Sequence, residues 1–239
     1  ADLTAMVKKG ILSETSTSFV NNEDSDYLKI LKEDDRKFLR EIKLHYEGMN
    51  AYALMKYTYL HFPYWAINSK TAREILSAEE LEIVNASRPK SNKKTLFTIG
   101  YEGISVEEYL NRLLRNDVKV LVDVRYNPLS MKYGFSKSRL QYFCKNLGIH
   151  YVHFPEVGIS SEQRRELKTQ TDYDNLFAIY KQDNLTKTTA TQLRIFNLLQ
   201  QYKRIALTCF EANVSQCHRK YLADAIGKLP GFEYEIKHI

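Results

Sequence analysis

The sequence is poor in the residues that mark several protein classes. Its 239 residues include only three cysteines, five prolines and nine glycines, which excludes a disulfide scaffold, a collagen-like fibre and a low-complexity tail. No apolar run approaches the ~20 residues that a membrane-spanning helix needs, so we expect no membrane contact. Because the cysteines are odd in number and widely spaced, we expect reduced thiols and a cytoplasmic protein.

Positive charge exceeds negative charge only slightly. The chain has 35 Lys and Arg against 29 Asp and Glu, a formal net charge of +6, and most of the excess follows residue 94. Such a bias favours polyanions as partners without requiring them. Function must therefore come from specific sites rather than from bulk charge.

A polar, basic stretch with one proline, residues 87–94, is typical of a surface linker. It predicts a small domain over residues 1–90 and a larger domain over residues 95–239. The chain begins with neither an initiator Met nor a signal-peptide pattern, so we expect a piece of a longer protein.

The first domain is predicted to be mainly helical. After a short helix that ends at Gly10, apolar residues at three- and four-residue intervals predict helices over 34–46 and 51–62. The polar excursion over 13–25, returning at Tyr27–Leu31, suggests a hairpin wing. This order resembles a truncated winged-helix domain, a type that holds DNA. The aromatic-rich stretch from Tyr52 to Trp65 favours core packing over base stacking.

From Thr95 onward, apolar strand patterns alternate with helical ones. Strands are predicted over 96–99, 118–124, 149–154, 204–209 and 232–239, with helices starting near residues 105, 136, 191 and 215. This alternation predicts a Rossmann-like α/β domain, a mostly parallel sheet with helices on both faces. Ligands of such sheets bind beyond the carboxyl ends of the strands.

Polar and titratable residues gather at those strand ends. They are Tyr101, Glu102, Asp123, Arg125, Glu156, Cys209, Glu211, Cys217, His218 and Arg219. Acidic residues at the start of a loop often only cap helices, so each member also has a structural interpretation.

Four of these segments resemble a known family. Thr98–Glu102, Leu121–Arg125, Tyr151–Gly158, and Cys209–Glu211 followed by Cys217–Arg219 stand in the order and spacing of the domain of unknown function DUF488. The resemblance covers about residues 95–239. It implies a Rossmann-like fold and an enzyme activity that is not assigned, but it supplies no reaction.

The residues themselves suggest several chemistries. In the first turn of a helix capped by Ser215, Cys217 would gain a lowered pKa and serve as a thiolate nucleophile, although a buried cysteine is the more common case. Arg125 and Arg219 would bind a phosphate or carboxylate, or instead neutralise nearby acids.

Two further possibilities concern the acidic residues and metal binding. Asp123, Glu156 and Glu211 would supply a general acid and base. Cys209, Glu211, Cys217 and His218 are metal-ligand types, but the spacing Cys-x7-Cys-His is not a standard zinc pattern, so no metal is expected. No cofactor is expected either, because neither G-x-G-x-x-G nor a P-loop motif is present.

The long polar segment over 158–189, with Arg164, Arg165, Lys168, Lys181 and Lys187, suggests a lid or a surface decoration.

These features predict an enzyme that acts on nucleic acid or on a nucleotide-like, phosphate-bearing substrate. The predicted catalytic residues are Cys217, Glu211, Asp123 and Glu156, and the predicted substrate-binding residues are Tyr101, Glu102, Arg125, Cys209, His218 and Arg219. One alternative is a non-enzymatic DNA-binding or regulatory protein that senses a small anion. Another is a redox sensor that uses Cys209 and Cys217.

Overall fold

The computed structural model describes residues 2–22, 31–160, 162–163, 167 and 169–239. The chain divides into two compact units, Ala1–Ile83 and Val84–Ile239. Within the described residues, no helix combines the length and apolar composition needed to cross a membrane.

The first unit is mainly helical. Its elements are α1 (Asp2–Lys8), a two-stranded antiparallel hairpin of β1 (Leu12–Glu14) and β2 (Phe19–Asn21), α2 (Glu33–Tyr46), α3 (Ala51–His61), α4 (Pro63–Ala66), α5 (Ala72–Ile75) and α6 (Ala78–Ala86), which ends in the second unit. Gly10, at a φ of +74°, follows α1 as the sequence predicts. Of the predicted return arm Tyr27–Leu31, residues 27–30 lie outside the described residues. The winged-helix interpretation stays a prediction.

Few side chains of the first unit are buried. Its buried apolar residues in the described part of the chain are Ala66, Ile67, Ala72, Ile75 and Leu76. Helices α2 and α3 contain no buried residue, so the apolar side chains that predicted them remain accessible. The aromatic-rich stretch is partly held by hydrogen bonds: the Tyr52 hydroxyl donates to the carbonyl of Ile75 at 3.1 Å.

The second unit contains a five-stranded parallel sheet. The strands are β3 (Thr95–Gly100), β4 (Val120–Asp123), β5 (His150–His153), β6 (Arg204–Cys209) and β7 (Glu235–His238), in the spatial order β5-β4-β6-β3-β7. Strand β6 therefore lies between β4 and β3 although it follows both in the chain. The predicted α/β fold with a parallel sheet is confirmed.

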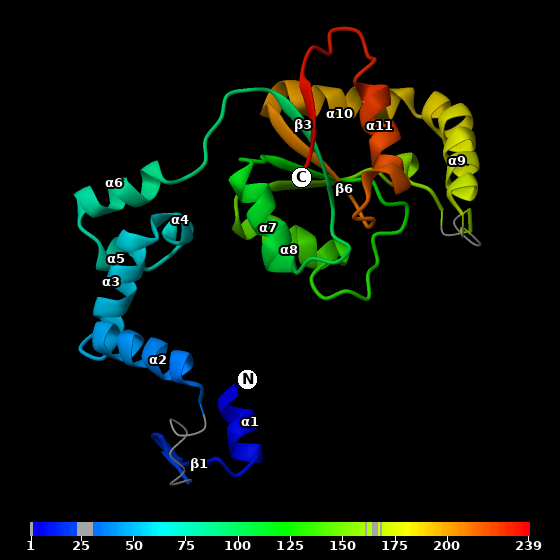
Figure 1. Cartoon of the computed structure of the whole chain (residues 1–239). Coiled ribbons are helices and arrows are strands. Elements are labelled where there is room, and N and C mark those ends of the chain that lie inside the picture. Colours follow the sequence, from blue (N-terminus) through cyan, green and yellow to red (C-terminus); the bar gives the residue numbers. More distant parts are fainter. Residues whose placement is uncertain (1, 23–30, 161, 164–166, 168) are drawn as a thin grey trace. The chain divides into compact units, whose positions relative to one another are not determined.

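Helices cover both faces of this sheet (Figure 1). Helices α7 (Val106–Arg115) and α8 (Lys137–Asn146) lie on one face, and α10 (Thr189–Tyr202) and α11 (His218–Ile226) lie on the other. The chain also contains the short turns η2 (Pro155–Val157) and η4 (Val214–Gln216), the helix α9 (Gln170–Ile179) and the π-helical stretch η3 (Tyr180–Leu185).

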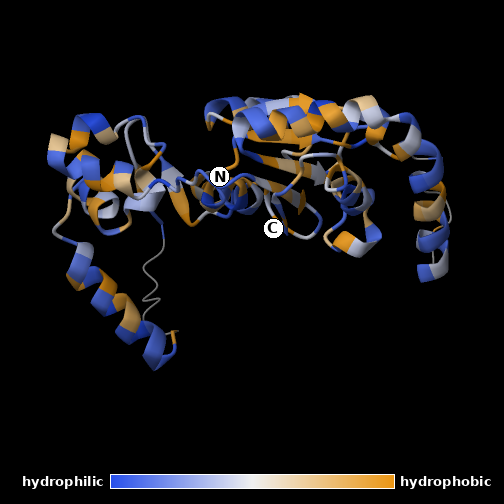
Figure 2. Cartoon of the chain, turned by 90° about the horizontal axis from the view of Figure 1, so that it is seen from above, coloured by the Kyte–Doolittle hydropathy of each residue, from blue (hydrophilic) through white to orange (hydrophobic). Residues whose placement is uncertain are grey.

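The hydrophobic core has two layers because successive residues of a strand point to opposite faces. Leu96 packs toward α10 and α11, whereas the next residue, Phe97, packs toward α7 and α8. Every residue of β3, β4 and β6 is buried, as expected for central strands of a parallel sheet. Figure 2 shows these strands as largely hydrophobic and the helices as striped.

Helix α7 begins with a side-chain cap. The hydroxyl of Ser105 accepts a hydrogen bond from the backbone N–H of Glu108 at 3.2 Å. Replacing a capping Ser by Ala typically costs about 1 kcal/mol of stability. We expect Ser105→Ala to lower the free energy of unfolding by about 1 kcal/mol in a denaturant titration, and Ser105→Asp, which also caps, to retain it. Equal stability of the Ala variant and the parent chain would show that the cap contributes nothing.

Candidate functional site

A cavity of about 300 Å³ opens at the carboxyl edge of the sheet. It lies among the segments that follow β3, β4 and β6. Because β6 is inserted between the two earlier strands β4 and β3, a crevice is expected at this edge of the parallel sheet. The residues of its wall that matter most are Tyr101, Arg125, Tyr126, Asn127, Cys209 and Phe210. The predicted strand-end location of a binding site thus coincides with a real cavity.

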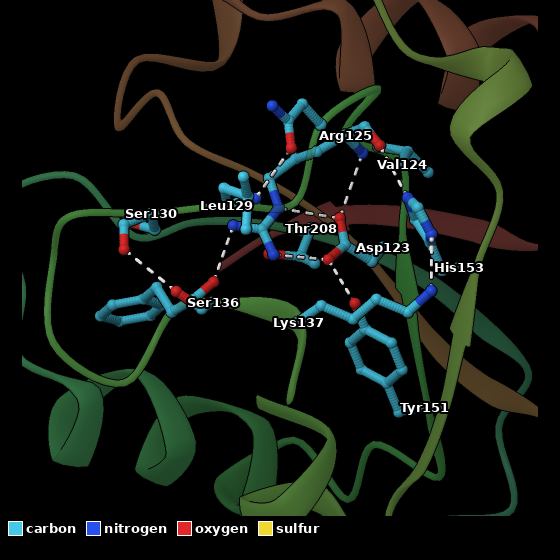
Figure 3. A network of polar contacts seen from close by, with 12 residues as sticks. Asp123, Val124, Arg125, Leu129, Ser130, Ser136, Lys137, Tyr151, His153 and Thr208 are labelled. Carbon is cyan, nitrogen blue, oxygen red and sulfur yellow. Dashed lines mark hydrogen bonds and ion pairs between the residues drawn. The ribbon is translucent and has the colours of Figure 1, made fainter. Parts of the chain in front are cut away.

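A buried ion pair lies beside this cavity, at the end of β4 (Figure 3). The Asp123 carboxylate accepts from Nε and Nη2 of Arg125 at 2.9 and 2.5 Å and from the hydroxyl of Tyr151 at 2.6 Å. Nη1 of Arg125 donates to the Tyr101 hydroxyl and to the carbonyl of Phe135, both at 2.8 Å. Asp123 is fully buried, so its oxygens are engaged in holding these partners.

The ion pair changes the pKa values of Arg125 and of the neighbouring Tyr151. Burial opposes the charge on Arg125, but the hydrogen bond and charge of Asp123 outweigh burial and raise the pKa of Arg125. Burial, followed by the Asp123 charge, raises the pKa of Tyr151. Arg125 is thus a permanent cation, and Asp123 is placed to position it rather than to transfer protons.

Arg219 is used differently from Arg125. It is 2% exposed, and its Nη1 and Nη2 donate to the backbone carbonyls of Glu211 and Ala212 at 2.5 and 3.2 Å. The sequence suggested that both arginines form one anion site or neutralise acids. Arg125 pairs with Asp123, whereas Arg219 fixes the loop after β6.

The loops after β3 and β6 are joined by hydrogen bonds. The backbone N–H groups of Tyr101 and Glu102 donate to the carbonyl of Phe210 at 3.1 and 2.9 Å, and the Glu102 carboxylate accepts from the backbone of Ala212 at 2.9 Å. A Cβ at Gly100 would overlap the carbonyl of Glu211, so glycine is required there. Tyr101 and Glu102 therefore position the loop that carries Glu211.

Four predicted site residues come together at the end of β6. Cys209 ends the strand, Glu211 follows it, Cys217 is the N-cap residue of α11, and His218 is the first residue of α11. One ligand-type atom from each lies within 4.8 Å of the other three. The Cys209 Sγ is 3.1 Å from Oε2 of Glu211 and 3.5 Å from Nδ1 of His218. We call these four residues the thiol cluster.

The partners of His218 define its tautomer. Its Nε2 lies 2.9 Å from the carbonyl oxygen of Val124, and because a carbonyl only accepts, Nε2 carries the proton. In the neutral ring Nδ1 then presents its lone pair to the side of Cys209. His218 faces Cys209 in the thiol cluster, whereas Arg219 faces the loop after β6. The two side chains diverge because consecutive helix positions are turned by about 100°.

The structure corrects the predicted environment of Cys217. Ser215 lies in η4, whose cap is the Asn213 side chain, and Cys217 itself is the N-cap residue of α11. Its side chain is fully buried. Burial above all, then the neighbouring Cys209, raises the pKa of Cys217 well above its usual value, with Arg219 only partly opposing this. The predicted lowered pKa was wrong because desolvation exceeds the helix dipole.

Glu156 lies apart from the cavity wall and the thiol cluster. Its carboxylate accepts from the hydroxyl of Thr191 at 2.8 Å and lies 3.8 Å from Nη1 of Arg194, both on α10. Glu211, by contrast, lines a smaller cavity of about 150 Å³. The structure therefore does not bring Glu156 and Glu211 together as an acid–base pair.

Much of the segment predicted as a lid or a surface decoration, residues 158–189, is helical. Residues 170–185 form α9 and η3, with Leu176, Phe177 and Tyr180 buried. Lys181 lies over the ring of Tyr221, and Lys187 is 3.9 Å from Asp183. Arg164, Arg165 and Lys168 lie outside the described residues.

Sequence reasoning missed part of the cavity wall. Tyr126, Asn127 and Phe210 line the cavity but were not among the predicted residues. They lie within four positions of a strand end, so extending the search beyond the first titratable residue of each loop would have found them.

The family described as domain of unknown function DUF488 matches residues 105–226. The chain belongs to the DUF488 family. No curated protein and no solved structure matched the chain. The matched DUF488 region includes the Asp123–Arg125 pair and the thiol cluster, whereas β3, with Tyr101 and Glu102 after it, precedes it.

The buried ion pair of this DUF488 domain should be important for stability. We expect Asp123→Asn to lower the free energy of unfolding by about 3–5 kcal/mol, because it leaves the buried Arg125 charge without its partner. The matched control is Glu235→Gln, which breaks an exposed pair with Lys93 and should leave the free energy of unfolding nearly unchanged, because solvent screens such a pair. Denaturant titration measures both. Equal, small losses would show that other contacts suffice to hold Arg125.

The reactivity of Cys217 tests its predicted role as a nucleophile. Cys144 on α8 is equally buried, and burial followed by the Asp123 charge raises its pKa to about 12. We expect iodoacetamide at neutral pH to leave both thiols unmodified in the folded DUF488 protein and to label both after unfolding, as read by peptide mass spectrometry. Fast labelling of Cys217 alone would restore it as a nucleophile.

Proposed function

We propose that this protein is an enzyme that acts on a nucleotide-like, phosphate-bearing substrate bound in the cavity at the carboxyl edge of the sheet. The observation that carries the proposal is the composition of that cavity. Three aromatic rings and a buried cation share its wall with Cys209, a member of the thiol cluster. Binding groups and reactive groups therefore meet at one place.

The aromatic wall suits a planar base. Tyr101 is buried and its ring stacks on Phe135 at 4.2 Å between centroids, which makes it rigid. Tyr126 and Phe210 are both substantially exposed and offer faces on which a base can stack. Asn127 adds an amide that can hydrogen-bond to base edges. A volume of about 300 Å³ lies at the lower end of the range for small-molecule sites.

Positive charge near the aromatic wall suits a phosphate. The hydrogen bonds of Arg125 to Asp123, Tyr101 and Phe135 use four of its five N–H groups. Among the described residues, the second N–H of Nη2 has no acceptor, so it is available to a ligand. Lys132 contributes a second charge, with Nζ held by the carbonyl of Tyr101 at 2.8 Å.

The reactive groups favour hydrolysis or group transfer. Glu211 itself borders the smaller cavity, but its carboxylate accepts from the thiol of Cys209, which lines the substrate cavity. We therefore assign acid–base work to Glu211, acting next to Cys209, whereas Asp123 holds Arg125. Of the two cysteines predicted as site residues, Cys209 lines the cavity and Cys217 does not.

The alternative, a regulator that senses an anion through two arginines, is weaker. Arg125 spends four of its five N–H groups on the protein itself, and the two terminal nitrogens of Arg219 are held by the backbone carbonyls of Glu211 and Ala212. A DNA-holding role for the first unit and a cytoplasmic location stay predictions.

A matched pair of tyrosines tests the proposal. Tyr126 lines the cavity and is 55% exposed, while Tyr142 on α8 is 59% exposed and does not line it. We expect the full chain to bind one of a panel of nucleoside mono- and diphosphates in calorimetry. Tyr126→Ala should lose about 1–3 kcal/mol of binding free energy, the worth of one base–aromatic stack, whereas Tyr142→Ala should bind normally.

The outcomes separate the alternatives. An enzyme is expected to convert the bound nucleotide to a product that chromatography detects. Loss of this conversion in Glu211→Gln would assign the acid–base role to that carboxylate. Binding without turnover would favour a sensor. An absence of nucleotide binding, or equal losses in both tyrosine variants, would overturn the proposed site.

A further inference from the structure

The thiol cluster contains two thiols, one imidazole and one carboxylate at the end of β6. We propose that Cys209, Cys217, His218 and Glu211 form a binding site for a zinc ion. This goes beyond the proposed function and does not depend on the substrate being a nucleotide. Three observations support it: the spacing of the ligand atoms, the outer contact of His218, and the chemistry of the donor set.

The spacing fits a four-coordinate ion. Zinc bonds of 2.0–2.3 Å in tetrahedral geometry place ligand atoms about 3.3–3.8 Å apart. The Cys209 Sγ lies 3.5 Å from Nδ1 of His218, and 3.1 Å from Oε2 of Glu211. All four ligand atoms lie within 4.8 Å of one another, so side-chain movements of about 1 Å would complete a tetrahedron.

The outer contact of His218 is the one that metal-bound histidines make. Such a histidine usually donates its second ring N–H to a carboxylate or a backbone carbonyl, which fixes the tautomer and aims the other nitrogen at the ion. Here the Nε2 of His218 is 2.9 Å from the Val124 carbonyl, and Nδ1 faces Cys209. The ring of Tyr180 packs edge-on against the imidazole at 5.6 Å and further limits its rotation.

The donor set selects the metal class. Ca²⁺ and Mg²⁺ prefer sites built from oxygen ligands, which two sulfurs and a nitrogen do not provide. Zinc accepts thiolate, imidazole and carboxylate together. With both thiols and Glu211 ionised, a zinc ion leaves one net negative charge, and Arg219, which already acts on Cys217 electrostatically, is placed to balance it.

The four proposed ligands differ in how deeply their side chains are buried. Cys209, Cys217 and His218 are at most 1% exposed, so they are fixed by the core. Glu211 is half-buried and borders the smaller cavity. We therefore assign Glu211 as the ligand that exchanges most readily. Because Cys209 also lines the cavity at the carboxyl edge of the sheet, the ion would lie next to the proposed substrate.

The competing explanation is a metal-free cluster held by hydrogen bonds alone, and metal uptake distinguishes the two. The full chain, reduced and stripped with a chelator, is dialysed against zinc, and bound metal is counted by mass spectrometry. We expect one zinc per chain. Co²⁺ in its place should give the intense visible bands of a tetrahedral site and the ultraviolet band of thiolate-to-metal charge transfer.

Matched variants locate the ion. Cys209→Ala and Cys217→Ala should lose the stoichiometric zinc and the charge-transfer band, and Glu211→Gln should retain zinc with weaker affinity. The control is Cys144→Ala, which removes an equally buried thiol from the other face of the sheet and should bind one zinc as the parent chain does.

Two results would overturn the zinc site. One is a folded parent chain that binds no stoichiometric zinc, or binds Co²⁺ without a thiolate band. The other is normal zinc binding by Cys209→Ala and Cys217→Ala. If these variants do not fold, the cobalt spectrum of the parent chain decides alone. Failure here would leave the nucleotide test intact, because that test depends on Tyr126.

Discussion

The buried ion pair between Asp123 and Arg125 holds together β4, β5 and the segment that follows β3. Asp123 ends β4 and binds Tyr151 of β5, while Arg125 reaches Tyr101 after β3 and the carbonyl of Phe135 before α8. Removing two charges from water costs several kcal/mol each unless their hydrogen bonds are nearly all satisfied. The buried part of the cavity wall, Arg125 and Tyr101, is therefore held by the same contacts that keep Arg125 charged.

A second constraint fixes the loop between β6 and α11. Gly100 lets the Glu211 carbonyl approach β3 closely, and Arg219 binds that carbonyl and the next one. These contacts set where Glu211 and Cys209 lie relative to the start of α11. The thiol cluster thus depends on backbone packing around a glycine and on a buried arginine, in addition to the contacts of Cys209 with Glu211 and His218.

The sequence was sufficient for the fold class because continuous apolar runs separated by helical patterns have few packings. Periodicity reports burial but not neighbours, so it did not place β6 between β4 and β3. The rule that ligands bind at strand ends pointed to Arg125 and Cys209, which line the cavity, whereas their predicted binding of substrate stays a prediction. It could not show that Asp123 is saturated by its partners, or that Cys209 and Cys217 meet, since both facts depend on contacts between distant segments.

At Cys217, burial and the helix N-terminus act on the thiol pKa in opposite directions, and burial dominates. A helix N-terminus stabilises a negative charge by about 0.3–1 kcal/mol, less than the 1.36 kcal/mol that one pKa unit represents. Complete burial opposes the charge much more strongly, and the nearby Glu211 carboxylate adds to that effect. Arg219 cannot reverse the balance while its fork is held by two carbonyls. A thiolate at this position therefore requires a stronger cation in direct contact with the sulfur, and a divalent ion shared with Cys209 and His218 meets that requirement.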